Sequence, residues 1–447
     1  MQAALLVANA RRADIGGNPV GWLAVDSDGV IAGEGTGNAP AGDYGEIIDA
    51  DGDLLFPGLI DTHAHYREPG LTHKGSMATE SRAALAGGIT AFFDMPNTVP
   101  PTVTVADVKA KKLIAARSAA INYAFFPAAT EQTAGILDEL MAEGVPGIKL
   151  FMGATTGGLG APEGRALGAL FAACARRGLP VMVHAEDNGI IADNAEYYVN
   201  KYGTRATVPT ACHALIRSGA ACLAATRRAV DLALCYGTRL HIAHVSTAAE
   251  VALLRTVKAA GDCGITAETT AMYLDPEFCK PERHADNRLK VNPAIKFEED
   301  RKALVDAVAD GTVDTLGTDH APHLPAEKDG GALTAASGAP SAQFALPVML
   351  EYLPSDVICD RMAASPARLF GLRRHGELRE GYVADFSLVE TGHPHRITDE
   401  DVLSPCGWTP FAGRTVHSRV RAVWLSGREA YRDGRFSGVV PSGLVFG

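Results

Sequence analysis

Two histidines stand two positions apart at the end of an apolar run, in the segment PGLIDTHAH at positions 57–65. On a β-strand, side chains two positions apart face the same way, so His63 and His65 can approach one metal ion. Histidine suits this role because a neutral imidazole offers a free nitrogen at physiological pH. Two polar residues at a strand end are common, so the metal interpretation needs further ligands.

Four more candidate ligands lie at or near the ends of other short apolar runs: Lys149, His184, His244 and Asp319. If these runs are strands of one barrel, their carboxyl ends meet at a single rim, where barrel enzymes place their active sites. Five strand ends then bring six side chains together, which is far less often accidental than one histidine is. Lys149 alone also fits a salt bridge at the rim, because an ordinary lysine is a poor metal ligand.

The middle of the chain has the alternation of elements that such a rim requires. Short apolar runs predict eight strands, at residues 56–63, 89–95, 121–127, 147–151, 180–185, 239–245, 264–270 and 313–319. Ala-rich stretches between them predict helices, at 75–87, 105–119, 132–144, 162–178, 211–236, 247–260 and 298–310. Alternating strands and helices indicate parallel strands joined by crossovers. We therefore predict an α/β fold with a TIM-like (β/α)8 barrel over residues 56–372.

The two ends of the chain have a different pattern. Short apolar runs separated by Gly and Asp predict antiparallel strands, at 3–8, 21–25, 29–33, 382–389 and 420–425. Neither end is long enough for a good core alone. Residues 1–55 and 373–447 are therefore expected to join in one small composite β-sandwich domain, with the barrel inserted between them.

Composition narrows the function classes. The 447 residues carry a formal net charge of −11, which disfavours a nucleic-acid partner. No apolar stretch approaches the roughly 20 residues that span a bilayer, and the N-terminus lacks a signal-peptide pattern. The eight cysteines are scattered without a C-x-x-C pair, as in a reduced protein. We expect a cytoplasmic protein that acts on a small molecule and contacts neither nucleic acid nor membrane.

The ligand pattern resembles that of the amidohydrolase superfamily, and within it the group of dihydroorotases, allantoinases and hydantoinases. The resemblance extends over nearly the whole chain, and it implies a metal-dependent cyclic amidohydrolase. It implies two metal ions, expected to be Zn²⁺: His63, His65 and Asp319 would bind the first, and His184 and His244 the second. Members of this group often dimerise, so a homodimer is compatible with the resemblance.

The same resemblance gives two ligands a special role. Lys149 would be carboxylated on its amine and would bridge both ions; residues 150–153, LFMG, resemble the segment that follows the bridging lysine. Some dihydroorotases carry Asp at this position, and lysine favours the bridged pair of ions. Asp319 would be the catalytic base.

Three further segments resemble the dihydroorotase version of the site: HYREPG at 65–70, DMPNT at 94–98 and TDHAPH at 318–323. They imply that Arg67, Asn97 and His323 hold a substrate carboxylate, and a guanidinium offers a planar, bidentate fork to such a group. Asn292 would contact the ring. Thr155 and Thr156 stand at a spacing that resembles a substrate-covering loop.

The implied reaction is the reversible hydrolysis of the L-dihydroorotate ring amide to N-carbamoyl-L-aspartate by a metal-bridging hydroxide, a step of pyrimidine biosynthesis. Two alternatives stay open. The first is another cyclic amidase, a hydantoinase or an allantoinase, and the second is a dihydroorotase-like scaffold without catalysis. One departure from relatives is Ala339 before Pro340, where Gly-Pro is common; it concerns the loop's shape and not the chemistry.

Overall fold

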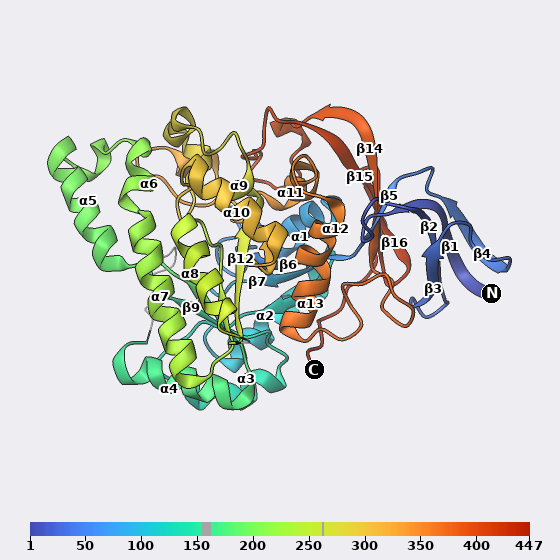
Figure 1. Cartoon of the computed structure of the whole chain (residues 1–447), viewed down its shortest axis with the longest axis horizontal. Coiled ribbons are helices and arrows are strands. Elements are labelled where there is room, and N and C mark those ends of the chain that lie inside the picture. The colour runs from blue at the N-terminus through green and yellow to red at the C-terminus, as the bar shows by residue number, and fades with distance from the viewer. Residues whose placement is uncertain (154–161, 262) are drawn as a thin grey trace.

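The computed structural model describes residues 1–153, 162–261 and 263–447 (Figure 1). At its centre are eight parallel strands in two hydrogen-bonded arcs, ordered β6-β7-β8 and β9-β10-β11-β12-β13. Their bounds are β6 (Leu59–Ala64), β7 (Ile89–Asp94), β8 (Asn122–Phe125), β9 (Ile148–Phe151), β10 (Val181–His184), β11 (Leu240–Ile242), β12 (Ile265–Thr270) and β13 (Thr315–Gly317). Each predicted strand of the barrel has its counterpart here.

Two isolated backbone bridges close the ring between these arcs. Ala128 pairs with Lys149 between β8 and β9, and Ala64 pairs with His320 between β13 and β6. Nearly all strand residues are buried, as expected for parallel strands covered on both faces. Because the strands are parallel, their carboxyl ends share one rim. The predicted α/β fold is confirmed.

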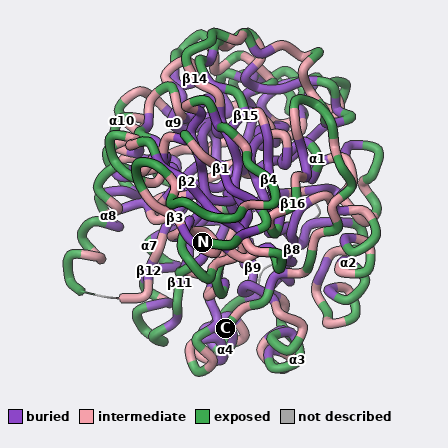
Figure 2. Tube along the Cα trace, turned by 90° about the vertical axis from the view of Figure 1, so that its right-hand side faces the viewer, coloured by how far each residue is buried: buried purple, intermediate pink, exposed green. Residues whose placement is uncertain are grey.

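Helices cover the outside of the ring, so the chain is buried at the centre and exposed on the outer turns (Figure 2). The main ones are α1 (Met77–Ala86), α2 (Val105–Ser118), α3 (Leu137–Ala142), α4 (Gly164–Arg177), α7 (Gly219–Tyr236), α8 (Ala248–Ala259), α10 (Glu298–Asp310) and α13 (Ser365–Phe370). The hydroxyls of Ser76, Thr104 and Thr247 each accept a backbone N–H from the first turn of the following helix. Such caps satisfy donors that have no partner within a helix.

Several helical regions differ from the sequence prediction. The helix predicted at 211–236 is divided into α6 (His213–Ile216) and α7, because Ser218 caps a new helix between them. Helix α5 (Asn188–Tyr202), at the left of Figure 1, was not predicted, although Ile191, Ala195 and Val199 stand at helical spacing and pack in one small apolar cluster. Four more α-helices were not predicted either: α13 and the remaining ones, α9 (Ala271–Leu274), α11 (Ala342–Met349) and α12 (Ser355–Cys359).

Both ends of the chain contribute to one nine-stranded sheet, at the right of Figure 1. Its strands are β1 (Gln2–Arg12), β2 (Val20–Val25), β3 (Ile31–Thr36), β4 (Asp43–Asp49), β5 (Leu54–Pro57), β14 (Phe386–Arg396), β15 (Thr415–Leu425), β16 (Arg428–Arg432) and β17 (Arg435–Phe436). Strand β5 joins the two ends, since it pairs with β1 on one side and with β14 on the other. Side chains from both ends, among them Val7, Leu23, Phe386 and Trp424, form one apolar cluster. The predicted composite β unit is therefore present.

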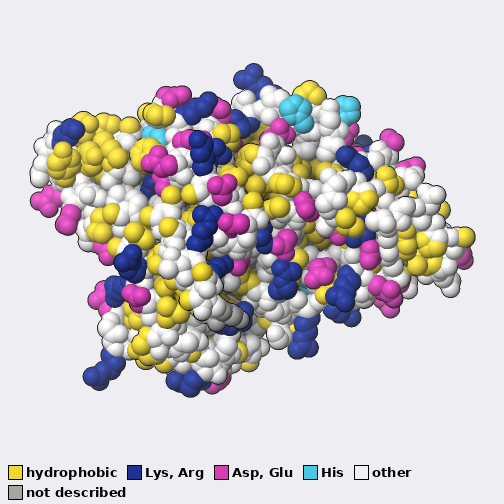
Figure 3. Space-filling view, in the orientation of Figure 1, with side chains coloured by type: hydrophobic (Ala, Val, Ile, Leu, Met, Phe, Trp, Pro, Cys, Tyr) yellow, Lys and Arg dark blue, Asp and Glu magenta, His cyan; other side chains and the backbone are white. Residues whose placement is uncertain are grey.

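The surface is mixed in charge. On the face seen in Figure 3, Lys and Arg side chains are interspersed with Asp and Glu, without a continuous basic area. Within the described residues, no helix combines the length and the apolar character needed to cross a lipid bilayer.

Candidate metal centre and active site

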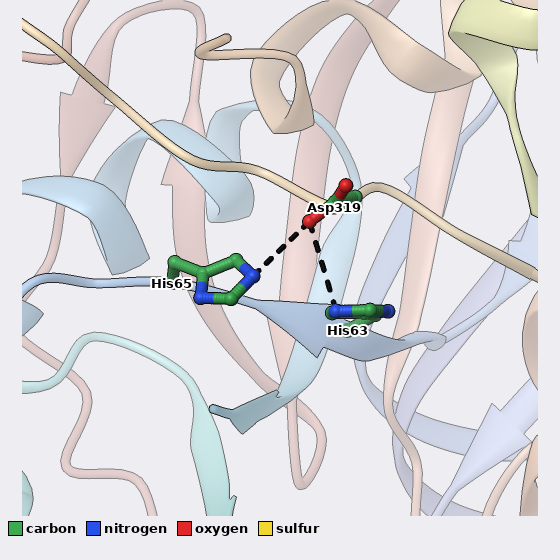
Figure 4. Close-up of side chains that lie close together, drawn as sticks. All are labelled: His63, His65 and Asp319. Atoms are coloured by element: carbon green, nitrogen blue, oxygen red, sulfur yellow. Dashed lines mark hydrogen bonds and ion pairs between the residues drawn. The ribbon is translucent and has the colours of Figure 1, made fainter. Parts of the chain in front are cut away.

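His63, His65 and Asp319 form a compact group at the carboxyl rim of the barrel (Figure 4). Asp319 Oδ1 lies 3.1 Å from His65 Nε2 and 3.6 Å from His63 Nε2. The candidate ligand atoms of the three residues all lie within 4.8 Å of one another. Two imidazole nitrogens and one carboxylate oxygen at this spacing suit one divalent metal ion.

A second pair of imidazoles faces the first group. His184 Nδ1 lies 2.9 Å from His244 Nε2, and the ring centroids of His63 and His244 are 5.1 Å apart. Between the groups, the fully buried Lys149 places Nζ 3.4 Å from His63 Nε2. Desolvation lowers the pKa of this lysine to about 8. The structure thus brings all six predicted ligands to the wall of one cavity.

The backbone at this rim is in an uncommon conformation. Arg67, His244 and Asp319 have φ values of 66°, 40° and 47°, in the left-handed region that residues other than glycine rarely adopt. Each such residue costs about 1–3 kcal/mol, and the cost is tolerated where the surroundings fix the conformation. Each of these three side chains lines the cavity. The left-handed backbone at these three positions therefore directs their side chains into the cavity.

Arg67 forms the cationic side of the cavity. Its guanidinium is buried; Nε donates to the Pro322 carbonyl at 3.0 Å, and Nη2 lies 3.1 Å from His323 Nε2. No carboxylate of the described residues forms an ion pair with it. Desolvation lowers the pKa of Arg67 to about 10, so it stays charged at neutral pH. Burial, and then the cations of Arg67 and Lys74, lower the pKa of His323, which keeps that ring neutral.

The two predicted asparagines also line the cavity. Asn97 Oδ1 lies 2.7 Å from His65 Nδ1, so this amide orients a candidate ligand as well as facing the cavity. Asn292 Oδ1 is buried and has no hydrogen-bond partner among the described residues. A buried polar atom without a partner is costly, and a bound molecule could satisfy it. Thr155 and Thr156 lie outside the described residues.

Comparison with known proteins agrees with this constellation. The model of the amidohydrolase family matches residues 54–430. The chain belongs to the amidohydrolase family. It is 35% identical over 415 residues to a dihydroorotase of Halobacterium salinarum, covering 88% of this chain and 92% of that one. It is also 34% identical over 425 residues to an allantoinase of Rubrobacter xylanophilus, covering 92% of this chain and 90% of that one.

Among solved structures, the L-hydantoinase (dihydropyrimidinase) from Arthrobacter aurescens superimposes with a TM-score of 0.91. The alignment covers 99% of this chain and 100% of that one at 24% identity, a level that supports a shared fold. The family match and the relatives make this chain a metal-dependent cyclic amidohydrolase. The relatives are named for different ring substrates, so the substrate of this chain has to be inferred from its own site.

In this amidohydrolase, buried carboxylates contact two of the imidazoles on the ring nitrogen that faces away from the proposed metal. Glu268 Oε1 lies 2.8 Å from His63 Nδ1, and Glu186 Oε2 lies 2.9 Å from His184 Nε2. Burial acts to raise the pKa of Glu268, but the neighbouring His63 and His241 lower it overall, so it is ionised. A carboxylate on one ring nitrogen fixes the tautomer and directs the other nitrogen at the metal. The described donors therefore fit a pair of metal ions.

The sequence analysis missed both of these glutamates. Glu186 follows a candidate ligand by two positions, a spacing that could have drawn attention to it. Glu268 is an acidic residue in the middle of a barrel strand, where apolar side chains are expected. Two histidines without an assigned ligand role are structural: His320 Nε2 lies 2.8 Å from Glu80, and His241 Nδ1 lies 2.9 Å from Thr266.

Replacing Glu268 by Gln is expected to weaken metal affinity by roughly 10–100-fold, because the amide no longer fixes the His63 tautomer as a carboxylate does. Competition with a chelator would measure the affinity. Glu250→Gln is the matched control, since Glu250 is an equally buried acid that accepts from the Thr226 and Thr247 hydroxyls away from the cavity. Equal affinities for the two variants would contradict a role for Glu268 in holding His63.

Proposed function

We propose that this amidohydrolase is a dihydroorotase, which opens the ring amide of L-dihydroorotate to N-carbamoyl-L-aspartate, and closes it, in pyrimidine biosynthesis. The observation that carries the proposal is Arg67: a buried guanidinium lines the cavity beside the candidate metal ligands, without an acidic partner among the described residues. A buried charge needs an opposite charge or strong hydrogen bonds. The carboxylate of dihydroorotate supplies one, whereas allantoin has no carboxylate.

The metals proposed are two Zn²⁺ ions. His63, His65 and Asp319 would hold one, His184 and His244 the other, and Lys149, carboxylated on its amine, would bridge them. When bound, the ions would polarise the ring carbonyl and lower the pKa of a water molecule to about 7. The fraction of Lys149 that burial keeps as a neutral amine can add carbon dioxide: a C–N bond forms, the nitrogen loses a proton, and the resulting carbamate carries a negative charge.

Asp319 would move the proton. Burial acts to raise the pKa of its carboxyl, but the nearby His63, His65 and Lys149 lower it overall, so Asp319 is ionised at neutral pH. It can accept a proton from the attacking water as the C–O bond forms, and then donate that proton to the amide nitrogen as the C–N bond breaks. In the direction of ring closure, the same carboxyl works in reverse. Arg67, Asn97, Asn292 and His323 would align the substrate, which lowers the entropic barrier.

The experiment that tests this proposal compares Arg67→Met with the wild type on L-dihydroorotate, allantoin and a hydantoin without a carboxylate. Losing one partner of a buried ion pair costs about 2–5 kcal/mol, so kcat/KM for dihydroorotate should fall roughly 30-fold or more. Rates on the carboxylate-free rings should change little. Arg239→Met is the matched control, because Arg239 donates to backbone carbonyls at the opposite end of the barrel.

Each outcome has a clear meaning. If the wild type prefers dihydroorotate and Arg67→Met loses that preference, the proposal holds. If the wild type prefers allantoin, or if Arg67→Met affects all three rings equally, Arg67 does not bind a substrate carboxylate, and the chain is another cyclic amidase. Turnover of none of these rings by metal-loaded protein would favour the non-catalytic scaffold. The convergence of six candidate ligands on one cavity argues against that last alternative.

A further inference from the structure

Another buried basic side chain lies beside the active-site cavity, and the proposed reaction does not use it. Lys328, at the end of the short helix Pro325–Lys328, is 4% exposed. Its ammonium donates to three backbone carbonyls: Lys290 at 2.9 Å, Ala336 at 3.0 Å and Gly338 at 2.8 Å. An ammonium has three N–H donors, so all of them are used. No acidic side chain of the described residues forms an ion pair with Lys328.

The three carbonyls belong to two separate segments that wall the cavity. Lys290 precedes Asn292 in the segment that follows β12, and Ala336 and Gly338 lie in the segment that follows β13. Asn292, Ser337 and Gly338 all line the cavity. The Gly338 N–H also donates to the Lys290 carbonyl at 2.9 Å, so the two segments meet at the Lys328 ammonium.

This junction extends to the cationic side of the cavity. The Ser337 carbonyl lies 3.1 Å from His323 Nε2, which itself lies 3.1 Å from Arg67 Nη2. On its other side, the Lys328 ammonium lies 5.6 Å from the centre of the buried Trp408 ring, within the range of a cation–π contact. Trp408 Nε1 in turn donates to the His323 carbonyl at 2.7 Å. Lys328 thus holds the wall against which His323 and Arg67 are placed.

We infer that Lys328 is a positioning residue for substrate binding: its ammonium ties the segments after β12 and β13 into one wall and so sets the distance from Asn292 and Ser337 to Arg67. Burial lowers the pKa of Lys328 to about 7, while the three carbonyls that converge on its nitrogen favour the protonated form with three donors. The role rests on the proposed function only for the choice of substrate. Lys328 touches none of the candidate metal ligands, so it should govern affinity and not the chemical step.

The test is Lys328→Met, which keeps the length of the side chain and removes all three donors. We expect KM for L-dihydroorotate to rise roughly ten-fold or more with kcat within about three-fold of wild type, the pattern of lost uniform binding. Metal content should be unchanged. Hydrogen exchange should become faster at the Ala336 and Gly338 amides, which donate to the Glu327 carbonyl beside Lys328 and to the Lys290 carbonyl. Lys258→Met is the control, because Lys258 also donates to a backbone carbonyl, that of Thr312, near the start of β13.

Unchanged KM and unchanged exchange in Lys328→Met would overturn the inference, and so would a loss of kcat or of metal with KM preserved. If Lys328→Met does not fold, Lys328→Gln, whose amide keeps two N–H donors, is measured in the same way. Hydrogen exchange separates the two proposals. Should the wild type act on another ring, faster exchange at the Ala336 and Gly338 amides with a raised KM for that ring would still support Lys328, while the dihydroorotase proposal would fail.

Discussion

Asp319→Asn is expected to reduce kcat by roughly 10²–10⁴-fold, the range usual for loss of a general acid–base group. The amide keeps the shape of the side chain and an oxygen for the metal, but it cannot accept the proton of the attacking water. Steady-state rates on L-dihydroorotate and metal analysis of the same sample would measure the effect. Metal content should change much less than kcat.

The control for this variant flanks the same strand, β13, at its other end. Asp314 precedes β13 at the opposite end of the barrel, where it pairs with Lys258 at 2.6 Å. Asp314→Asn should therefore affect stability and leave kcat close to that of the wild type. If Asp319→Asn kept near-normal turnover with full metal content, another group would have to carry the proton.

Lys149→Ala should lose most of its metal, because the side chain proposed to bridge both sites is removed. Outer partners of metal ligands are worth 10–100-fold in affinity, so a bridging ligand should cost roughly 100-fold or more. Short carboxylic acids such as acetate or propionate should restore part of the metal content and activity, since they can occupy the space of the missing carbamate. Metal analysis and activity across a series of acid concentrations would measure this.

Lys296→Ala serves as the control for removing a buried lysine. Lys296 is 4% exposed, and its Nζ donates to the Ala294 carbonyl without lining the cavity. It should keep its metal and should not respond to carboxylic acids. Full metal content in Lys149→Ala would instead leave Lys149 with the salt-bridge or structural role that a rim lysine often has.

The barrel could be predicted because each of its elements is indicated by a local pattern of residues in the sequence. Each strand is a short apolar run, and each run has its counterpart among β6–β13. The ends of the strands were less predictable. The run at 239–245 was expected to be one strand, but β11 ends at Ile242, and His244 lies beyond it with a left-handed φ of 40°. The backbone turns at the rim because the packed barrel requires it, and an apolar run in the sequence does not show where that turn occurs.

The candidate site divides in the same way. Metal-ligand types at strand ends are visible in the sequence, so His63, His65 and the other four residues could be named together. The residues that position these ligands and the substrate-binding side chains could not be predicted, because each of them contacts a segment far away in the chain. Glu268 reaches His63 across 205 positions, and Trp408 reaches the His323 carbonyl across 85. No local pattern links such pairs, and only the closed ring brings them into contact.

The closure of that ring has a thermodynamic consequence. Strands β9 and β10 share four residue pairs, whereas β13 and β6 are joined by the single bridge from Ala64 to His320. His63 and Asp319 stand on opposite sides of this seam, so an ion held between them would cross-link two edges that the backbone joins by one bridge. Ligands that bind only the folded state stabilise it in proportion to the logarithm of their concentration over Kd. Removing metal should therefore lower the melting temperature and speed amide exchange along this seam, so the supply of metal would affect the protein's lifetime as well as its rate.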